Sequence, residues 1–162
     1  MTLMRAWLVA VAMTVGNAAL GLSQGPPAAA VNVDAQGVAL HGHDAVAYFT
    51  VGKAVPGAAQ FEHQWNGARW RFASAANRDA FAKAPENYAP QFGGYCSWAV
   101  SRNYTADIDP NAFTVVNGKL YVNYSTAVQA RWQVDRDGNI TKAGGNWPGL
   151  LAQVPAKKPG GR

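Results

Sequence analysis

Cys96 is the only cysteine in this chain of 162 residues, and its thiol is the first candidate for chemistry. Gly93 and Gly94 permit a sharp turn before it, and the stretch from Tyr95 to Ser101 contains neither glycine nor proline. We therefore expect a short helix that starts near Tyr95, with Cys96 in its first turn. Unpaired backbone N–H groups and the helix dipole favour a thiolate there, the form that binds a metal ion or attacks a disulfide.

A structural role for Cys96 is the alternative. Free cysteine is among the residue types most often buried, and it then behaves as a small hydrophobic side chain. Tyr95 and Trp98 lie beside it in the sequence and offer an apolar environment. The sequence leaves both interpretations open.

His41 and His43 flank Gly42 and are the next candidates. Side chains two residues apart in an extended segment point the same way, so both imidazoles would reach one ion. With Cys96 as the third ligand, the set suits copper or zinc. The leading prediction is therefore transition-metal binding, copper ahead of zinc, through Cys96 with His43 and His41. Loop histidines that bind nothing are the alternative, and no other cofactor is expected.

Two further function classes stay open. A thiol-redox protein would use Cys96 through a sulfenic acid or a mixed disulfide with a redox partner, because the chain has no second cysteine. A non-catalytic module would bind a small molecule in an aromatic pocket. No Gly-rich phosphate loop, Cys-x-x-Cys pair or G-x-S-x-G motif occurs, so nucleotide-binding and hydrolase functions have no support and no catalytic residue is assigned. The pocket candidates are aromatic residues in irregular segments: Tyr48, Tyr95, Trp98 and Tyr104.

Hairpins and helices must position these residues. Aromatic and polar side chains alternate over 61–72 around Asn66-Gly67, which predicts a β-hairpin with a two-residue turn. Ser74 is a helix cap, and the helix that it starts ends before Pro85. Together with a second hairpin and helix later in the chain, this predicts an α+β fold with two β-hairpin-plus-helix units around one aromatic-rich core.

The same pattern returns about 51 residues later. Asn117-Gly118 marks a second hairpin, and Ser125 can cap a second helix. Turn and cap residues account for most of the identities between the two halves, so the similarity is taken as one of architecture. Beyond the second helix, Asp137 to Pro148 has helical fragments that Gly144-Gly145 is expected to break.

The net charge of +5 comes mostly from the ends of the chain. Arg5 lies near the N-terminus, and Lys157, Lys158 and Arg162 lie in the last eight residues. Without these four, 10 basic residues face 9 acidic ones. A basic face for nucleic acid is therefore not expected, and residues 155–162 are predicted to form a disordered basic tail.

The N-terminus is typical of a secretory signal. Met1 to Arg5 is short and basic, Ala6 to Val15 is apolar, and a small-residue cleavage motif ends at Ala30. We predict a signal peptide over 1–30 and a domain over 31–154, located in the periplasm or secreted. After cleavage no stable membrane span is expected, and the partner is a metal ion or a small molecule rather than nucleic acid.

Residues Trp65 to Tyr88 resemble the YHS domain, a small hairpin-plus-helix module. They follow its spacing G-x-x-Y-x-F-x-S-x(6)-F-x(3)-P-x-x-Y, with Trp70 in place of the tyrosine. The flanking motifs GHDAVAYF at 42–49 and GGYCSWA at 93–99 resemble the exported bacterial branch of that family, some members of which carry selenocysteine. The resemblance extends from Val33 to Pro148.

What the resemblance implies about metals rests on other members of the family. YHS domains fused to heavy-metal ATPases suggest metal handling through cysteines that flank the hairpin and helix. Those positions are Ala73 and Asn77 in this sequence, so the usual pair of thiols is absent. A metal site here must therefore use Cys96 and the two histidines.

Overall fold

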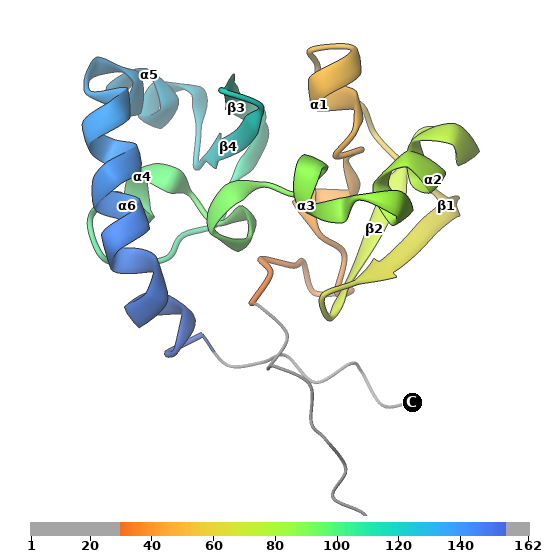
Figure 1. Cartoon of the computed structure of the whole chain (residues 1–162), viewed down its shortest axis with the longest axis horizontal. Helices are drawn as coiled ribbons and strands as arrows, with labels where there is room; N and C mark the ends of the chain where they lie inside the picture. The colour runs from red at the N-terminus through yellow and green to blue at the C-terminus, as the bar shows by residue number, and fades with distance from the viewer. Residues whose placement is uncertain (1–29, 155–162) are drawn as a thin grey trace, which may run out of the picture.

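The computed structural model describes residues 30–154 (Figure 1). The predicted signal peptide, except Ala30 at its end, and the predicted basic tail lie outside these residues. Within them, no helix is both long and apolar enough to cross a membrane. The described part of the chain is built from two hairpin-plus-helix units, with short helical segments before and between them and a long helix after the second.

The first unit is the hairpin of strands β1 (Ala58–Trp65) and β2 (Ala68–Phe72), followed by helix α2 (Ala75–Lys83). The strands pair antiparallel, and Trp65 lies opposite Ala68. Asn66 and Gly67 both have positive φ, as a two-residue hairpin turn with the twist of the strands requires. The Ser74 hydroxyl accepts a hydrogen bond from the N–H of Asn77, which confirms the predicted helix cap.

The second unit repeats the first with every boundary moved by 51 residues. Its elements are strand β3 (Asp109–Val116), strand β4 (Lys119–Asn123) and helix α5 (Thr126–Val134). They have the same lengths as β1, β2 and α2, and Ser125 caps α5 through the N–H of Val128. The two hairpins form separate two-stranded sheets. The predicted α+β fold with two such units is therefore confirmed.

Short helical segments connect the units. The 3-10 turn η1 (Leu40–Gly42) and helix α1 (Ala47–Thr50) precede the first hairpin. Helix α3 (Pro85–Tyr88), the 3-10 turn η2 (Gln91–Gly94) and helix α4 (Ser97–Ser101) lie between the units. Cys96 is the N-cap of α4 rather than a residue of its first turn. Figure 1 shows this connecting segment running between the two hairpins.

The expectation that Gly144-Gly145 breaks the last helix is wrong. Helix α6 runs without interruption over Arg136–Leu151 and lies along the outer side of the second unit (Figure 1). Its residues Ala143 and Leu150 are buried against Val100 of α4. The apolar area that this packing removes from water offsets the cost of two glycines, which is about 1 kcal/mol each.

One apolar core joins the two units, and aromatic rings occupy the same place in each. In the first unit the Trp70 and Phe81 ring centroids are 4.9 Å apart, and in the second Tyr121 and Trp132 are 5.5 Å apart. Both pairs join the second strand of a hairpin to the helix that follows. Phe81 and Trp132 are fully buried, so each helix is fastened to its own hairpin by a large ring.

Close backbone packing at Gly57 leads to the first prediction. A Cβ atom there would lie 2.5 Å from the carbonyl carbon of Arg71 in β2, which has no room to move. Gly57→Ala is therefore expected to lower the free energy of unfolding by about 2 kcal/mol, measured by urea denaturation. Gly144→Ala is the matched control, because nothing lies within 4 Å of a Cβ at this exposed helical position. It should raise stability by about 0.5–1 kcal/mol, and equal effects of the two substitutions would contradict the packing argument.

Candidate functional site

The thiol of Cys96 lies inside the protein. Only 1% of the residue is exposed, and it belongs to the main apolar core. Its Sγ accepts a hydrogen bond from the N–H of Tyr124 at 3.2 Å, and lies 3.9 Å from Oδ1 of the buried Asn123. Cys96 is thus buried, as the structural alternative for this residue expected.

The two histidines do not lie on an extended segment. His41 has φ 50° and ψ 34°, a left-handed conformation within η1, so the alternation argument for a shared side does not hold. The Nε2 of His41 lies 2.7 Å from Oδ1 of Asp107, and the Nδ1 of His43 lies 3.2 Å from the carbonyl oxygen of Leu40. Each imidazole thus already has a hydrogen-bond partner.

Asp107 ties the beginning of the domain to the loop before β3. Its Oδ1 accepts hydrogen bonds from the Asn32 side chain and from the N–H of Ile108, beside the contact with His41. Partial burial alone would raise the pKa of this carboxyl, but the hydrogen bonds from His41, Asn32 and Ile108 outweigh it and hold the pKa below its usual value. The arrangement fixes the segment 32–41 in place.

Within residues 30–154, no group of three or more His, Cys, Asp and Glu side chains could hold a metal ion. Copper or zinc binding through Cys96, His43 and His41 therefore stays a prediction.

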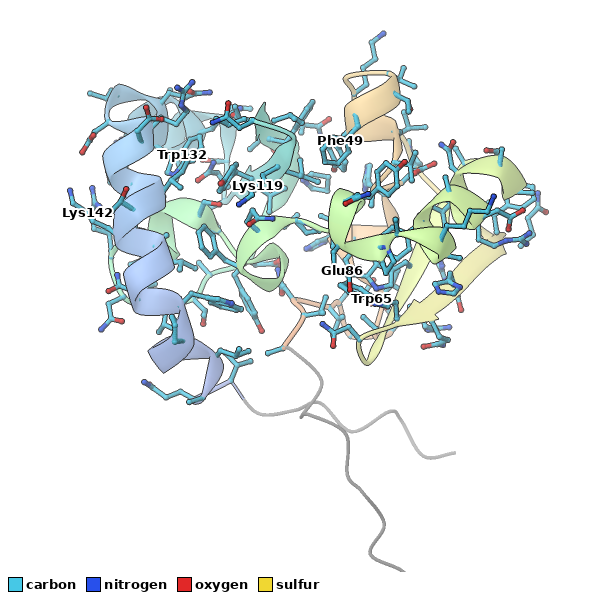
Figure 2. All side chains as sticks on the ribbon, viewed as in Figure 1. Phe49, Trp65, Glu86, Lys119, Trp132 and Lys142 are labelled. Carbon is cyan, nitrogen blue, oxygen red and sulfur yellow. The ribbon has the colours of Figure 1, made fainter. Side chains whose placement is uncertain are left out.

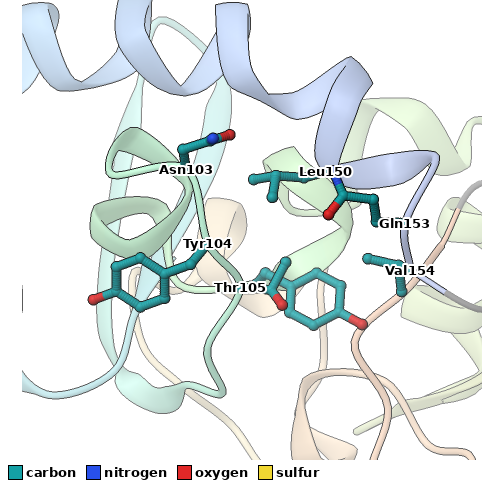
Figure 3. Close-up of a pocket in the computed structure, with 7 residues that line it drawn as sticks. Asn103, Tyr104, Thr105, Leu150, Gln153 and Val154 are labelled. Atoms are coloured by element: carbon teal, nitrogen blue, oxygen red, sulfur yellow. The ribbon is translucent and has the colours of Figure 1, made fainter.

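The four aromatic residues predicted to share a pocket are not gathered in one. Tyr95 and Tyr104 line a cavity of about 470 Å³ whose other lining residues are Asn103, Thr105, Leu150 of α6, and Gln153 and Val154 just after that helix (Figure 3). Tyr48 is buried instead, where its hydroxyl donates to the Pro110 carbonyl and burial raises its pKa well above the usual value. Trp98 lies under the guanidinium of Arg102, which is 3.9 Å from its ring centroid.

A second concave site, which we call the tryptophan groove, lies where the two units meet. It has a volume of about 410 Å³. The first unit contributes Trp65 and Trp70, whose ring centroids are 5.7 Å apart, and the second side contributes Phe92 and Trp147, 6.1 Å apart. Its remaining lining residues are Val31, Asn66, Glu86, Ala89, Pro90, Gln91 and Gly93.

Among the described residues that line the tryptophan groove, Glu86 is the one that carries a charge. It is exposed and makes no ion pair with any residue that the structure describes. Figure 2 shows it close to Trp65, and both residues line the groove. The groove thus combines the partly exposed rings of Trp65, Phe92 and Trp147 and the almost fully buried ring of Trp70 with a negative charge that no described residue pairs.

The tryptophan groove could not be predicted from the sequence because its residues come from distant parts of the chain. Trp65 belongs to β1, Glu86 to α3, Phe92 to η2 and Trp147 to α6. The one signal in the sequence that could have indicated the groove was the number of tryptophans. The alternation of aromatic and polar residues in the hairpins predicted core positions for them instead. That assignment holds for Trp70, which is 2% exposed, whereas Trp65 and Trp147 are only partly buried.

Comparison with known proteins bears on the first unit. No curated protein and no solved structure matches the chain. The family model described as YHS domain matches residues 46–92, a segment from α1 through the first hairpin and helix to Phe92 of the tryptophan groove. The match supports the YHS family for this segment of the chain.

Proposed function

We propose that this protein is a non-catalytic binding module that holds a small organic cation in the tryptophan groove. The observation that carries the proposal is the combination of Trp65, Trp70, Phe92 and Trp147 around one concave surface with Glu86, whose carboxylate has no ion pair within residues 30–154. A volume of about 410 Å³ lies within the range of small-molecule sites.

The chemistry of the lining favours a cation over a neutral or anionic ligand. The faces of aromatic rings carry negative electrostatic potential and attract cations, most strongly for tryptophan. The carboxylate of Glu86 in the lining also attracts a positive charge. No lysine or arginine within residues 30–154 lines the groove, so none of the described lining residues opposes a positive charge. A quaternary ammonium group fits this environment, because it offers positive charge on an apolar surface.

The structure favours binding of a small molecule over metal binding or thiol chemistry for two reasons. Cys96 is sealed in the core, and the two histidines are engaged with Asp107 and Leu40. Copper or zinc binding is the competing proposal, and metal analysis of the purified protein tests it. From the N-terminal sequence we also propose that the protein binds this ligand outside the cytoplasm.

Calorimetric titration with choline tests the proposal. We expect saturable binding, and weaker binding by at least about fivefold for the neutral isostere in which a quaternary carbon replaces the nitrogen. Trp147→Leu keeps an apolar side chain but removes a ring, and should weaken choline binding by about tenfold. Glu86→Gln removes only the charge and should weaken it by about threefold.

Tyr104→Leu is the matched control, since Tyr104 is an exposed aromatic residue of the other cavity. It should leave choline binding unchanged. Equal affinity for choline and its neutral isostere, or equal loss in Tyr104→Leu and Trp147→Leu, would refute the proposal.

A further inference from the structure

The predicted basic tail, residues 155–162, begins close to the tryptophan groove. Trp147 lines the groove and lies in α6, and the described part of the chain ends at Val154. The N–H of Val154 donates to the carbonyl oxygen of Leu150 at 3.0 Å, so the helical course continues past the end of α6. At about 1.5 Å per residue, Val154 lies roughly 10 Å along the helix axis from Trp147. The basic tail therefore starts about two helical turns from the groove.

The basic tail is long enough for its lysines to reach the groove. Its sequence is PAKKPGGR, which holds Lys157, Lys158 and Arg162 and no acidic residue. The proline that follows Val154 lacks the N–H that would continue the helix, so the basic tail need not follow the axis of α6. Three residues in extended conformation span about 10 Å, as far as Val154 lies from Trp147. The four-carbon stem of a lysine side chain then extends the reach of its ammonium group into the groove.

Glu86 is the residue of the groove whose charge lacks a partner. The other eight acidic side chains within residues 30–154 each make a hydrogen bond or an ion pair with a described residue. Within the same part of the chain the carboxylate of Glu86 makes neither, although it lines a site with aromatic rings. A lysine ammonium complements such a site, because it pairs with a carboxylate and is attracted to the faces of aromatic rings.

Charge favours the basic tail over the N-terminal segment as the occupant of the groove. The N-terminal side of the described chain also lies at the groove, since Val31 lines it. Residues 6–30, however, contain no charged side chain and offer no partner to Glu86. The basic tail carries three positive charges in eight residues. Charge complementarity therefore selects the basic tail.

We propose that the basic tail docks in the tryptophan groove of its own chain, with the ammonium group of Lys157 or Lys158 against the aromatic rings and the carboxylate of Glu86. The inference rests on the proposed function, because it uses the same preference for cations. The short tether holds the lysines at an effective concentration of about a millimolar, so a millimolar intrinsic affinity is enough for partial occupancy. A free organic cation has to displace the basic tail before it binds, so the basic tail lowers the apparent affinity for choline.

Carbodiimide cross-linking of the full chain, with no ligand added, tests the contact directly. The reagent couples a carboxylate to an amine that touches it, and it takes up the water that is lost as it becomes a urea. Peptide mass analysis is expected to find an amide between Glu86 and Lys157 or Lys158 within one chain. Asp79 and Asp137 are the control carboxylates, because both are exposed and lie outside the groove. Equal coupling to them, a link between two chains, or no link to Glu86 overturns the proposal.

Substitution of both lysines in the full chain gives a second test. Lys157→Gln/Lys158→Gln keeps the length of the basic tail and removes both ammonium groups. Calorimetric titration with choline should show an affinity at least about threefold higher than that of the wild type, as expected if the basic tail fills the groove about two thirds of the time. Lys53→Gln/Lys119→Gln is the matched control, because it removes the same charge from two exposed lysines outside the groove. Equal affinity gains in the two double variants, or no gain in the first, contradict the docking of the basic tail.

The two experiments separate a failure of this inference from a failure of the proposed function. An intramolecular link to Glu86 in a protein that does not bind choline supports the docking of the basic tail and refutes the proposed ligand. Choline binding without a link to Glu86, and with unchanged affinity in Lys157→Gln/Lys158→Gln, overturns the docking and leaves the proposed function standing.

Discussion

Replacing Asp44 with alanine is expected to lower the free energy of unfolding by about 4 kcal/mol. The carboxylate accepts four hydrogen bonds inside the protein, three from backbone N–H groups and one from Asn77. Alanine removes the acceptor of all four donors and leaves the buried N–H groups of Val46 and Ala47 unpaired, and hydrogen bonds to a charged group are the stronger kind. Urea denaturation followed by circular dichroism measures the change.

Asp44→Asn and Asp79→Ala separate the causes. Asn keeps the shape of Asp44 but turns one acceptor into a donor that faces other donors, so it should also cost more than about 2 kcal/mol. Asp79 is exposed, and within residues 30–154 its ion pair is with the neighbouring Arg78, so Asp79→Ala should change stability by less than about 0.5 kcal/mol. Unchanged stability of Asp44→Asn would show that side-chain volume, not hydrogen bonding, matters at this position.

Phe81→Ala is expected to cost about 3–5 kcal/mol, because its ring is the centre of the first unit's aromatic core. The ring is fully buried and contacts the rings of Trp65, Trp70 and Phe72 at centroid distances of 5.8, 4.9 and 5.1 Å. Removing it leaves a cavity that these rigid side chains cannot fill. The same loss should weaken choline binding, since Trp65 and Trp70 line the tryptophan groove.

The control for Phe81→Ala is Val134→Ala at the end of α5, where the side chain is 88% exposed. Its free energy of unfolding should change by less than about 0.5 kcal/mol. Phe81→Leu should recover part of the loss, because it restores apolar volume without the ring. A Phe81→Ala variant as stable as Val134→Ala would contradict the central role of the ring.

Local signals in the sequence determined the two units. Asn66-Gly67 and Asn117-Gly118 fix tight turns by their own backbone preferences. Ser74 and Ser125 each cap the helix that follows by accepting a hydrogen bond from the N–H three residues later. Such interactions span a few residues, so each can be predicted without knowing the rest of the fold. For the same reason the spacing of 51 residues was visible, because it repeats the same local patterns.

Packing decided the rest. Gly144-Gly145 weakens a helix locally, yet α6 continues because Ala143 and Leu150 bury against α4. The sequence left the burial of Cys96 open, and the fold buries it against Tyr124 and Asn123, which lie 28 and 27 residues later in the chain.

The tryptophan groove exists only once Trp65 and Trp147 have met across the fold, although 82 positions separate them in the sequence. Turn and cap preferences act over a few bonds, whereas burial and shape depend on which distant surfaces come together. The sequence by itself therefore determined the elements of this protein, and the tertiary structure alone decided which side chains share a site.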